Sequence, residues 1–133
     1  MPDHKKELMD YRLQSARERL HSSELLLKEG SYKDSINRSY YTMFTAIRAL
    51  LAMDGQDFSK HAGVISYFQK EYIKAGIFDK KYSKYISQAF QIRNNVDYTD
   101  FFLVSEQDAR MQCERAAEFL DTIEKYLKNE ELS

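Results

Sequence analysis

Apolar residues recur along this chain at steps of three and four positions, which is the spacing of one face of an α-helix. The periodic pattern stops at Gly30 and in three turn-like segments, at residues 53–59, 74–80 and 99–105. No stretch of useful length alternates between apolar and polar residues, as a half-buried strand would. The pattern therefore predicts helices joined by short turns, and no strand.

These breaks divide the chain into five expected helices. The first covers about residues 3–29 and the second about 32–53, a shorter third follows residue 59, a fourth follows residue 79, and the last follows residue 105. Four polar residues stand where a helix cap is expected: Ser31, Ser59, Asp79 and Ser105. The pair formed by Ser105 and Asp108 indicates a reciprocal cap.

Two of the expected helices carry clear apolar stripes. The second is the most apolar and is expected to be the most buried; its stripe is Ile36, Tyr40, Met43, Ile47 and Leu50. The stripe of the last helix is Ala109, Cys113, Ala116, Leu120, Ile123 and Leu127. We therefore expect an all-α fold, an up-and-down antiparallel bundle of about five helices in a single domain over residues 1–133.

One charged residue interrupts the stripe of the fourth helix. Arg93 follows Ile86 and Ala89 at helical spacing and precedes Asp97 by one turn. An exposed ion pair at a helix end, worth at most about 0.5 kcal/mol, is one interpretation. It does not explain why the arginine shares a face with apolar residues, since burying a lone guanidinium is costly. The other interpretation is that this face opens to a cleft, an interface or an anion.

Polar residues on the second helix suggest partners for this arginine. Asn37 and Tyr41 lie one turn apart with Arg38 beside them, and Arg48 is a further polar residue without an obvious role. If the second and fourth helices pack side by side, the two polar groups converge. Guanidinium groups pair with phosphate oxygens and aromatic rings stack on bases, so such a site suits nucleotides or RNA.

Composition removes several other classes of function. Twenty basic residues balance 21 acidic ones, so bulk charge does not indicate nucleic acid or membrane binding. Cys113 is the sole cysteine and the three histidines have no metal-ligand spacing, which leaves no metal site and no cofactor motif. The polar N-terminus and the lack of a long apolar run favour a cytoplasmic protein with no membrane span.

Three segments in this order resemble the HEPN superfamily (higher eukaryotes and prokaryotes nucleotide-binding). They are "YYTMFTAIRALL", "KHAGVI" and "RNNVDY", and the similarity extends over about residues 10 to 127. The chain looks like the small stand-alone bacterial and archaeal members. The resemblance implies a helical bundle, usually a homodimer whose polar motifs face a shared cleft. It also implies a possible partnership with a minimal nucleotidyltransferase in a toxin–antitoxin-like pair.

Many members of that superfamily are metal-independent endoribonucleases with an arginine, a polar residue and a later histidine. Arg93 and Asn94 match the first part of this motif, but Tyr98 stands where the shortest spacing places the histidine. A phenol with a pKa near 10 is a poor base at neutral pH, although it can donate a proton or hold a phosphate. His61 is the one histidine that could substitute; otherwise it is a partly exposed surface or capping residue.

Three functions remain open at this point. The first is a protein that binds nucleotide or RNA in a cleft lined by Arg93, Asn94, Asp97 and Tyr98, together with Asn37, Arg38, Tyr41 and His61. The second is an active endoribonuclease toxin that uses Arg93 with Tyr98 or His61 as catalytic residues. The third is an interaction module in which the polar cluster only fixes helix register and dimer geometry.

Overall fold

The computed structural model describes residues 4–132 and is built of helices, with no strand in that range. The elements are α1 (His4–Lys28), α2 (Tyr32–Asp54), α3 (His61–Phe68), the π-helix η1 (Gln69–Lys74), α4 (Lys81–Tyr98) and α5 (Glu106–Leu132). The predicted all-α bundle is confirmed. Gly30, Gly55 and Gly76 end α1, α2 and η1 in the left-handed conformation, which favours glycine at these turns.

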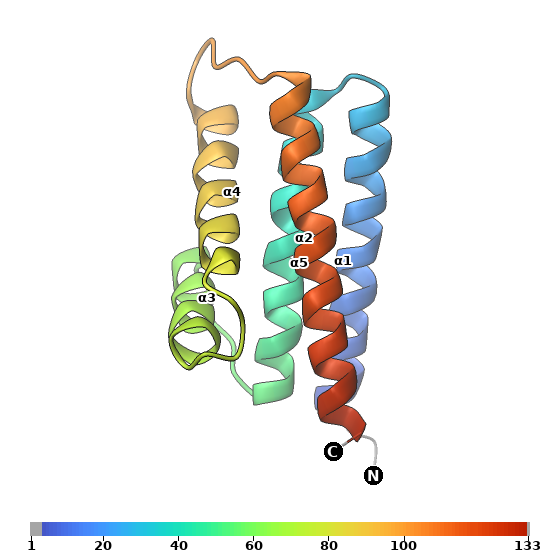
Figure 1. Cartoon of the computed structure of the whole chain (residues 1–133), viewed down its shortest axis with the longest axis vertical. Helices are drawn as coiled ribbons and strands as arrows, with labels where there is room; N and C mark the ends of the chain where they lie inside the picture. The colour runs from blue at the N-terminus through green and yellow to red at the C-terminus, as the bar shows by residue number, and fades with distance from the viewer. Residues whose placement is uncertain (1–3, 133) are drawn as a thin grey trace.

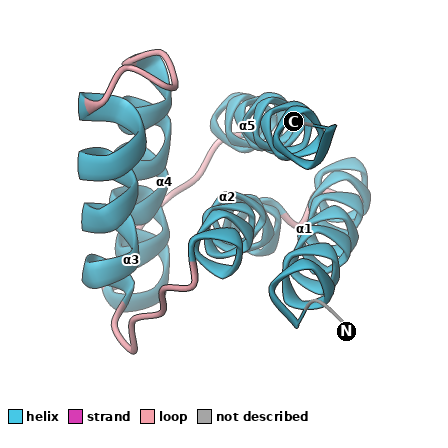
Figure 2. Ribbon diagram, turned by 90° about the horizontal axis from the view of Figure 1, so that it is seen from below, coloured by secondary structure: helices cyan, strands magenta, loops and turns pink. Residues whose placement is uncertain are grey.

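Four long helices run along the same axis, and α3 with η1 lies across that axis below the start of α4, beside α2 (Figures 1 and 2). Helix α2 is antiparallel to α1, as their short connection predicts, and it is also antiparallel to α4. Helices α2 and α5 instead point the same way, because the chain passes through α3 and α4 between them (Figure 1).

Helix α2 is the centre of the fold and contacts α1, α3, α4 and α5. All five residues of its predicted stripe are at most 1% exposed, as are Ala46, Ala49 and Leu51. Burying a side chain the size of leucine or isoleucine contributes roughly 1.5–3 kcal/mol, so this helix supplies a large share of the apolar stabilisation. The predicted stripe of α5 is buried in full as well.

The helix caps follow the sequence only in part. Ser105 and Asp108 form the predicted reciprocal cap of α5, because each backbone N–H donates to the other side chain, at 3.3 and 3.0 Å. Ser31 stands at the cap of α2 but makes no side-chain bond to it. Asp79 accepts from the N–H of Lys81, one residue outside the cap position of α4.

The predicted cap at Ser59 is wrong, since α3 begins at His61 after Lys60. Apolar packing fixes this start instead: the Phe58 ring contacts that of Tyr67 and its Cβ approaches Gly63 so closely that an added Cβ there would lie 3.2 Å away. The pattern also did not predict η1. Asp54 at the end of α2 accepts hydrogen bonds from the hydroxyls of Tyr67 and Tyr72, at 2.9 and 2.5 Å, and so ties α3 and η1 to α2.

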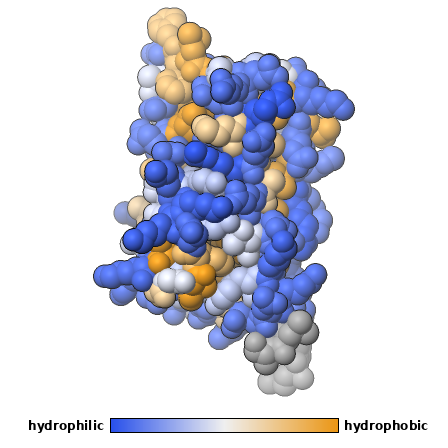
Figure 3. Space-filling view, viewed as in Figure 1, coloured by the Kyte–Doolittle hydropathy of each residue, from blue (hydrophilic) through white to orange (hydrophobic). Residues whose placement is uncertain are grey.

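The segment joining α4 to α5 carries the most exposed apolar side chains of the fold. Phe101 is 97% exposed and Leu103 is 87% exposed. Figure 3 shows apolar atoms gathered at this tip of the molecule. Phe101 has a φ of 60°, a conformation that bulky residues rarely adopt. None of the helices within residues 4–132 is long and apolar enough to span a membrane.

Candidate functional site

Arg93 lies between α4 and α2 with its side chain 16% exposed. Its Nη2 donates a hydrogen bond of 3.0 Å to the hydroxyl of Tyr41, so the side chain reaches from one helix to the other. Its guanidinium carbon also lies 5.6 and 5.3 Å from the ring centres of Tyr40 and Tyr41. The two helices therefore pack side by side, and the aromatic rings of α2 form the apolar surroundings of Arg93, where cation–π contacts stabilise its charge.

Two neighbours on the same helix also contact Arg93. Asp97 places a carboxylate oxygen 2.9 Å from Nε, and Nη1 donates to the side-chain oxygen of Asn94 at 3.2 Å. The Nε atom is buried yet makes no hydrogen bond, so the contact with Asp97 is an ion pair with a misaligned N–H. A guanidinium has five N–H donors, and this one still has donors for an anion.

His61, the first residue of α3, joins the same cluster. Its ring is stacked on that of Phe44, with ring centres 4.2 Å apart and 26° between the planes. Its Nδ1 shares a hydrogen bond of 2.8 Å with the hydroxyl of Tyr40. Burial lowers the pKa of His61, and the positive charges of Arg93 and Arg48 lower it further. The imidazole is therefore neutral at neutral pH.

The bond to Tyr40 determines which nitrogen of His61 carries the proton. Tyr40 is fully buried, and burial raises the pKa of its hydroxyl far above the usual range, so the hydroxyl keeps its proton. A protonated hydroxyl can donate its hydrogen bond to its partner, Nδ1 of His61. A neutral imidazole that accepts at Nδ1 carries its own hydrogen on Nε2. With the Tyr40 hydroxyl as the donor of this bond, His61 presents an N–H to a ligand rather than a free lone pair.

A hollow of about 390 Å³ adjoins the cluster on the α3 side. It is lined by Phe44, Arg48, Asp57, Phe58, Ser59 and His61. Phe44 and His61 belong to both the hollow and the cluster, which makes the two continuous.

The remaining predicted site residues lie apart from this cluster. Tyr98 ends α4 with 77% of its surface exposed, and no side-chain partner for it occurs among the described residues. Arg38 is exposed and Asn37 is half-buried, and neither contacts Arg93 through a hydrogen bond. The structure thus brings together Arg93, Asn94, Asp97, Tyr41 and His61.

Sequence reasoning missed several residues of the site. The sequence pattern assigns no role to Arg48, places Asp57 in the turn at residues 53–59 and places Tyr40 in a buried stripe. The available signal was the spacing of Tyr41, Phe44 and Arg48, which puts all three on one face of α2.

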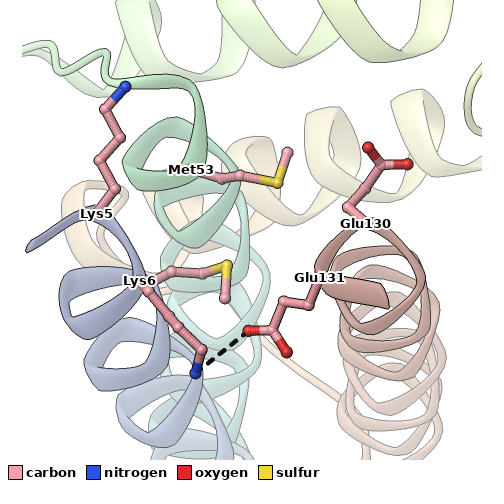
Figure 4. Close-up of a pocket in the computed structure, with 6 residues that line it drawn as sticks. Lys5, Lys6, Met53, Glu130 and Glu131 are labelled. Atoms are coloured by element: carbon pink, nitrogen blue, oxygen red, sulfur yellow. Dashed lines mark ion pairs between the residues drawn. The ribbon is translucent and has the colours of Figure 1, made fainter. Parts of the chain in front are cut away.

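A second hollow, of about 490 Å³, lies at the end of the bundle where α1 begins and α5 ends. Figure 4 shows Lys6 of α1 reaching Glu131 of α5 there, with a separation of 3.5 Å between Nζ and Oε1. Opposite charges thus pair across its mouth, and none of the residues discussed above lines it. Within residues 4–132, no group of His, Cys, Asp or Glu side chains is arranged to hold a metal ion.

These observations define a small helical-bundle protein with an arginine–aromatic site between two antiparallel helices. A family model of the HEPN domain matches residues 9–126, and the chain belongs to this family.

Curated relatives cover nearly the whole chain. A UPF0332 protein from Thermotoga maritima is 34% identical over 94% of this chain and 95% of its own length. A Methanocaldococcus jannaschii protein named "Putative toxin MJ0142" is 31% identical over 86% of this chain and 78% of its own length. A second protein of that organism, with the same kind of name, MJ0605, is 31% identical over 87% and 86%.

Proposed function

We propose that this HEPN protein binds the phosphate groups of RNA or nucleotides at the Arg93 cluster, as one half of a toxin–antitoxin-like pair with a minimal nucleotidyltransferase. The observation that carries the proposal is the position of Arg93. Its guanidinium is held by Tyr41 from a second helix, by Asn94 and by Asp97, and still keeps unused donors. A fixed guanidinium fork matches phosphate geometry, and it needs little reordering on binding.

The surrounding rings support a nucleotide ligand over a simple anion. Tyr41, Phe44 and His61 form a continuous aromatic set beside the guanidinium, with Tyr41 and His61 ring centres 5.9 Å apart. Base–aromatic stacking contributes roughly 1–3 kcal/mol per base, so a base near these rings adds to the affinity of its phosphate. A cytoplasmic location fits this ligand.

Endoribonuclease activity is the second candidate function, and the names of the two Methanocaldococcus jannaschii relatives favour it. The chemistry of the cluster favours binding instead. Cleavage needs groups that move protons at neutral pH. The Nδ1 of His61 is in a hydrogen bond with Tyr40, and Tyr98 is exposed at the end of α4, apart from the cluster. A third function, a pure interaction module, would use the cluster only to fix helix packing.

We also propose that a second copy of the chain covers the tip between α4 and α5. Phe101 and Leu103 are almost fully exposed there, and Tyr98 lies at the adjoining helix end. Phe101 holds a disfavoured backbone conformation while its ring lies in solvent, a cost that a partner surface would offset. Such an interface would also cover the exposed ring of Tyr98.

Incubation with labelled single-stranded and structured RNA in the presence of a chelator tests binding against cleavage. We expect saturable binding without cleavage by the wild-type protein, and loss of binding by Arg93→Ala. Arg110→Ala is a matched control, because Arg110 is an exposed arginine on α5 that pairs with Glu106. Equal RNA binding by the wild-type protein and Arg93→Ala would contradict the proposed binding site. RNA cleavage by the wild-type protein that is lost in Arg93→Ala would show that the protein is an endoribonuclease instead.

Co-expression with the minimal nucleotidyltransferase encoded nearest to this gene tests the pairing. We expect the two proteins to purify together at a fixed ratio. If the two proteins elute separately and RNA binding is intact, the proposed partnership is contradicted and the proposed binding function stands.

A further inference from the structure

The face of α2 that carries Tyr41 continues past Phe44 to Arg48. These residues stand at positions i, i+3 and i+7, so Arg48 lies about 10 Å along the helix axis from Tyr41. Arg93 is bonded to Tyr41 at one end of this face, and Arg48 lines the hollow at the other end. The stacked rings of Phe44 and His61 lie between the two guanidinium groups.

Arg48 is a positive group with incomplete pairing. Its Nε is buried and makes no hydrogen bond, and its Nη2 is 3.7 Å from Asp57, beyond hydrogen-bond distance. Arg12, which is buried, donates from Nη1 to the backbone oxygen of Arg48 at 2.8 Å and lies 3.9 Å from the same Asp57 carboxylate. Two guanidinium groups thus share one carboxylate whose side chain is 62% exposed.

We propose that the hollow beside Arg48 is a second phosphate subsite, so that the protein selects a phosphodiester chain spanning Arg48 and Arg93 over a mononucleotide. This inference rests on the proposed function and specifies its ligand. One phosphate pairs with Arg93, another with Arg48, and the nucleoside between them lies against Phe44 and His61. The ring of His61 lines the hollow and can contact a sugar or phosphate oxygen there.

Asp57 has a defined part in this arrangement. Its carboxylate lies in the hollow at loose distances from both arginines, where an incoming phosphate would make shorter and better aligned bonds. In the free protein the Asp57 carboxylate therefore occupies the place near Arg48 that a phosphate would take, and it competes with an incoming ligand. Removing the charge of Asp57 should therefore strengthen the binding of a phosphodiester chain.

The test compares a 5′-phosphorylated dinucleotide with the matching nucleoside monophosphate by calorimetric titration. We expect Arg48→Gln to weaken dinucleotide binding about ten-fold or more, because a charge-assisted bond is lost. Monophosphate binding should stay within about two-fold, since Arg93 alone can hold a single phosphate. Asp57→Asn should tighten dinucleotide binding, and Arg110→Gln should change neither ligand.

The outcomes separate this inference from the proposed function. If Arg93→Gln weakens both ligands while Arg48→Gln and Asp57→Asn change neither, the second subsite is overturned and the binding function stands. If neither ligand binds the wild-type protein, both are overturned. Asp57→Asn keeps the test valid if the Arg48 variant misfolds. It replaces an exposed loop residue, and its expected effect is tighter binding, which misfolding cannot produce.

Discussion

At the scale of single residues, the side chains around Arg93 determine what it can do. Tyr41 holds one end of the guanidinium, Asp97 neutralises part of its charge, and two rings lie beside it. A lone buried guanidinium would be costly, and these contacts make the position stable without using every donor.

Arg93→Lys tests whether the shape of the guanidinium matters beyond its charge. A lysine keeps the positive charge but loses the planar fork, so it cannot bond Tyr41 and Asn94 while also pairing a phosphate. We expect RNA affinity to fall about ten-fold, with little change in the salt dependence of what binding remains. Fluorescence anisotropy at several salt concentrations measures both, and affinity equal to wild type would show that charge alone suffices.

His61 should make the stability of the fold depend on pH. Its pKa is lowered in the folded protein, so below about pH 6.5 the unfolded chain binds a proton that the folded chain resists. The stability present at neutral pH should therefore decrease as the pH falls through this range toward the lowered pKa. Thermal melts of wild type and His61→Gln between about pH 7 and 5 measure the effect. Equal slopes for the two proteins would contradict it.

The sequence predicted part of this site and could not predict the rest. Arg93 was found because it interrupts an apolar stripe, and Tyr41 because it lies one turn from Asn37 on the second helix; local spacing makes both visible. The contact of His61 with Tyr40 depends on how the turn after α2 returns to the bundle, which no local spacing encodes. The solvent position of Tyr98 depends on where α4 ends, and helix ends are the least certain part of a pattern.

At the scale of elements, the five helices were predictable because their apolar stripes repeat within each segment. Helix α2 shows this best, since every residue of its predicted stripe is buried. The π-helix η1 was not, because its wider hydrogen bonding leaves no local pattern. Its Tyr72 is held by Asp54 of α2, a tertiary contact that local spacing does not encode. Caps were predicted correctly at Ser105 and wrongly at Ser59, where apolar packing fixes the helix start.

The caps of α5 and α2 offer a matched pair of stability measurements. Ser105→Ala should cost about 1 kcal/mol, because the side chain of Ser105 accepts the N–H of Asp108. Ser31→Ala should cost much less, since Ser31 stands at a cap but makes no side-chain bond. Urea denaturation of both variants compares the two costs. Equal costs would show that the reciprocal cap adds nothing to α5.

At the scale of the whole molecule, the bundle leaves one apolar tip uncovered between α4 and α5. Arg93 and Asp97 lie on the last turns of α4, so a partner that covers the tip also borders the site. The proposed dimer interface would therefore cover the exposed Phe101 and lie next to the partly buried Arg93 cluster.

Phe101→Gly separates the dimer from an incidental exposed loop. Glycine accepts a φ of 60° without strain, so each chain should gain about 1 kcal/mol of stability at low concentration. The same change removes apolar surface from the proposed interface and should shift the protein toward monomer in sedimentation velocity. Leu25→Ser, at an exposed apolar residue of α1, should leave self-association unchanged. A wild-type protein that stays monomeric at high concentration would refute the dimer.

The most direct measurement of the central claim is a nitrogen–proton NMR titration of the labelled protein with a short single-stranded RNA. The account predicts the largest backbone shifts around Tyr41 in α2, around Arg93 in α4 and at the start of α3, near His61. It also predicts a change in the Nε–H resonance of Arg93. Shifts confined to α1 and α5, or none up to about 1 mM RNA, would contradict it.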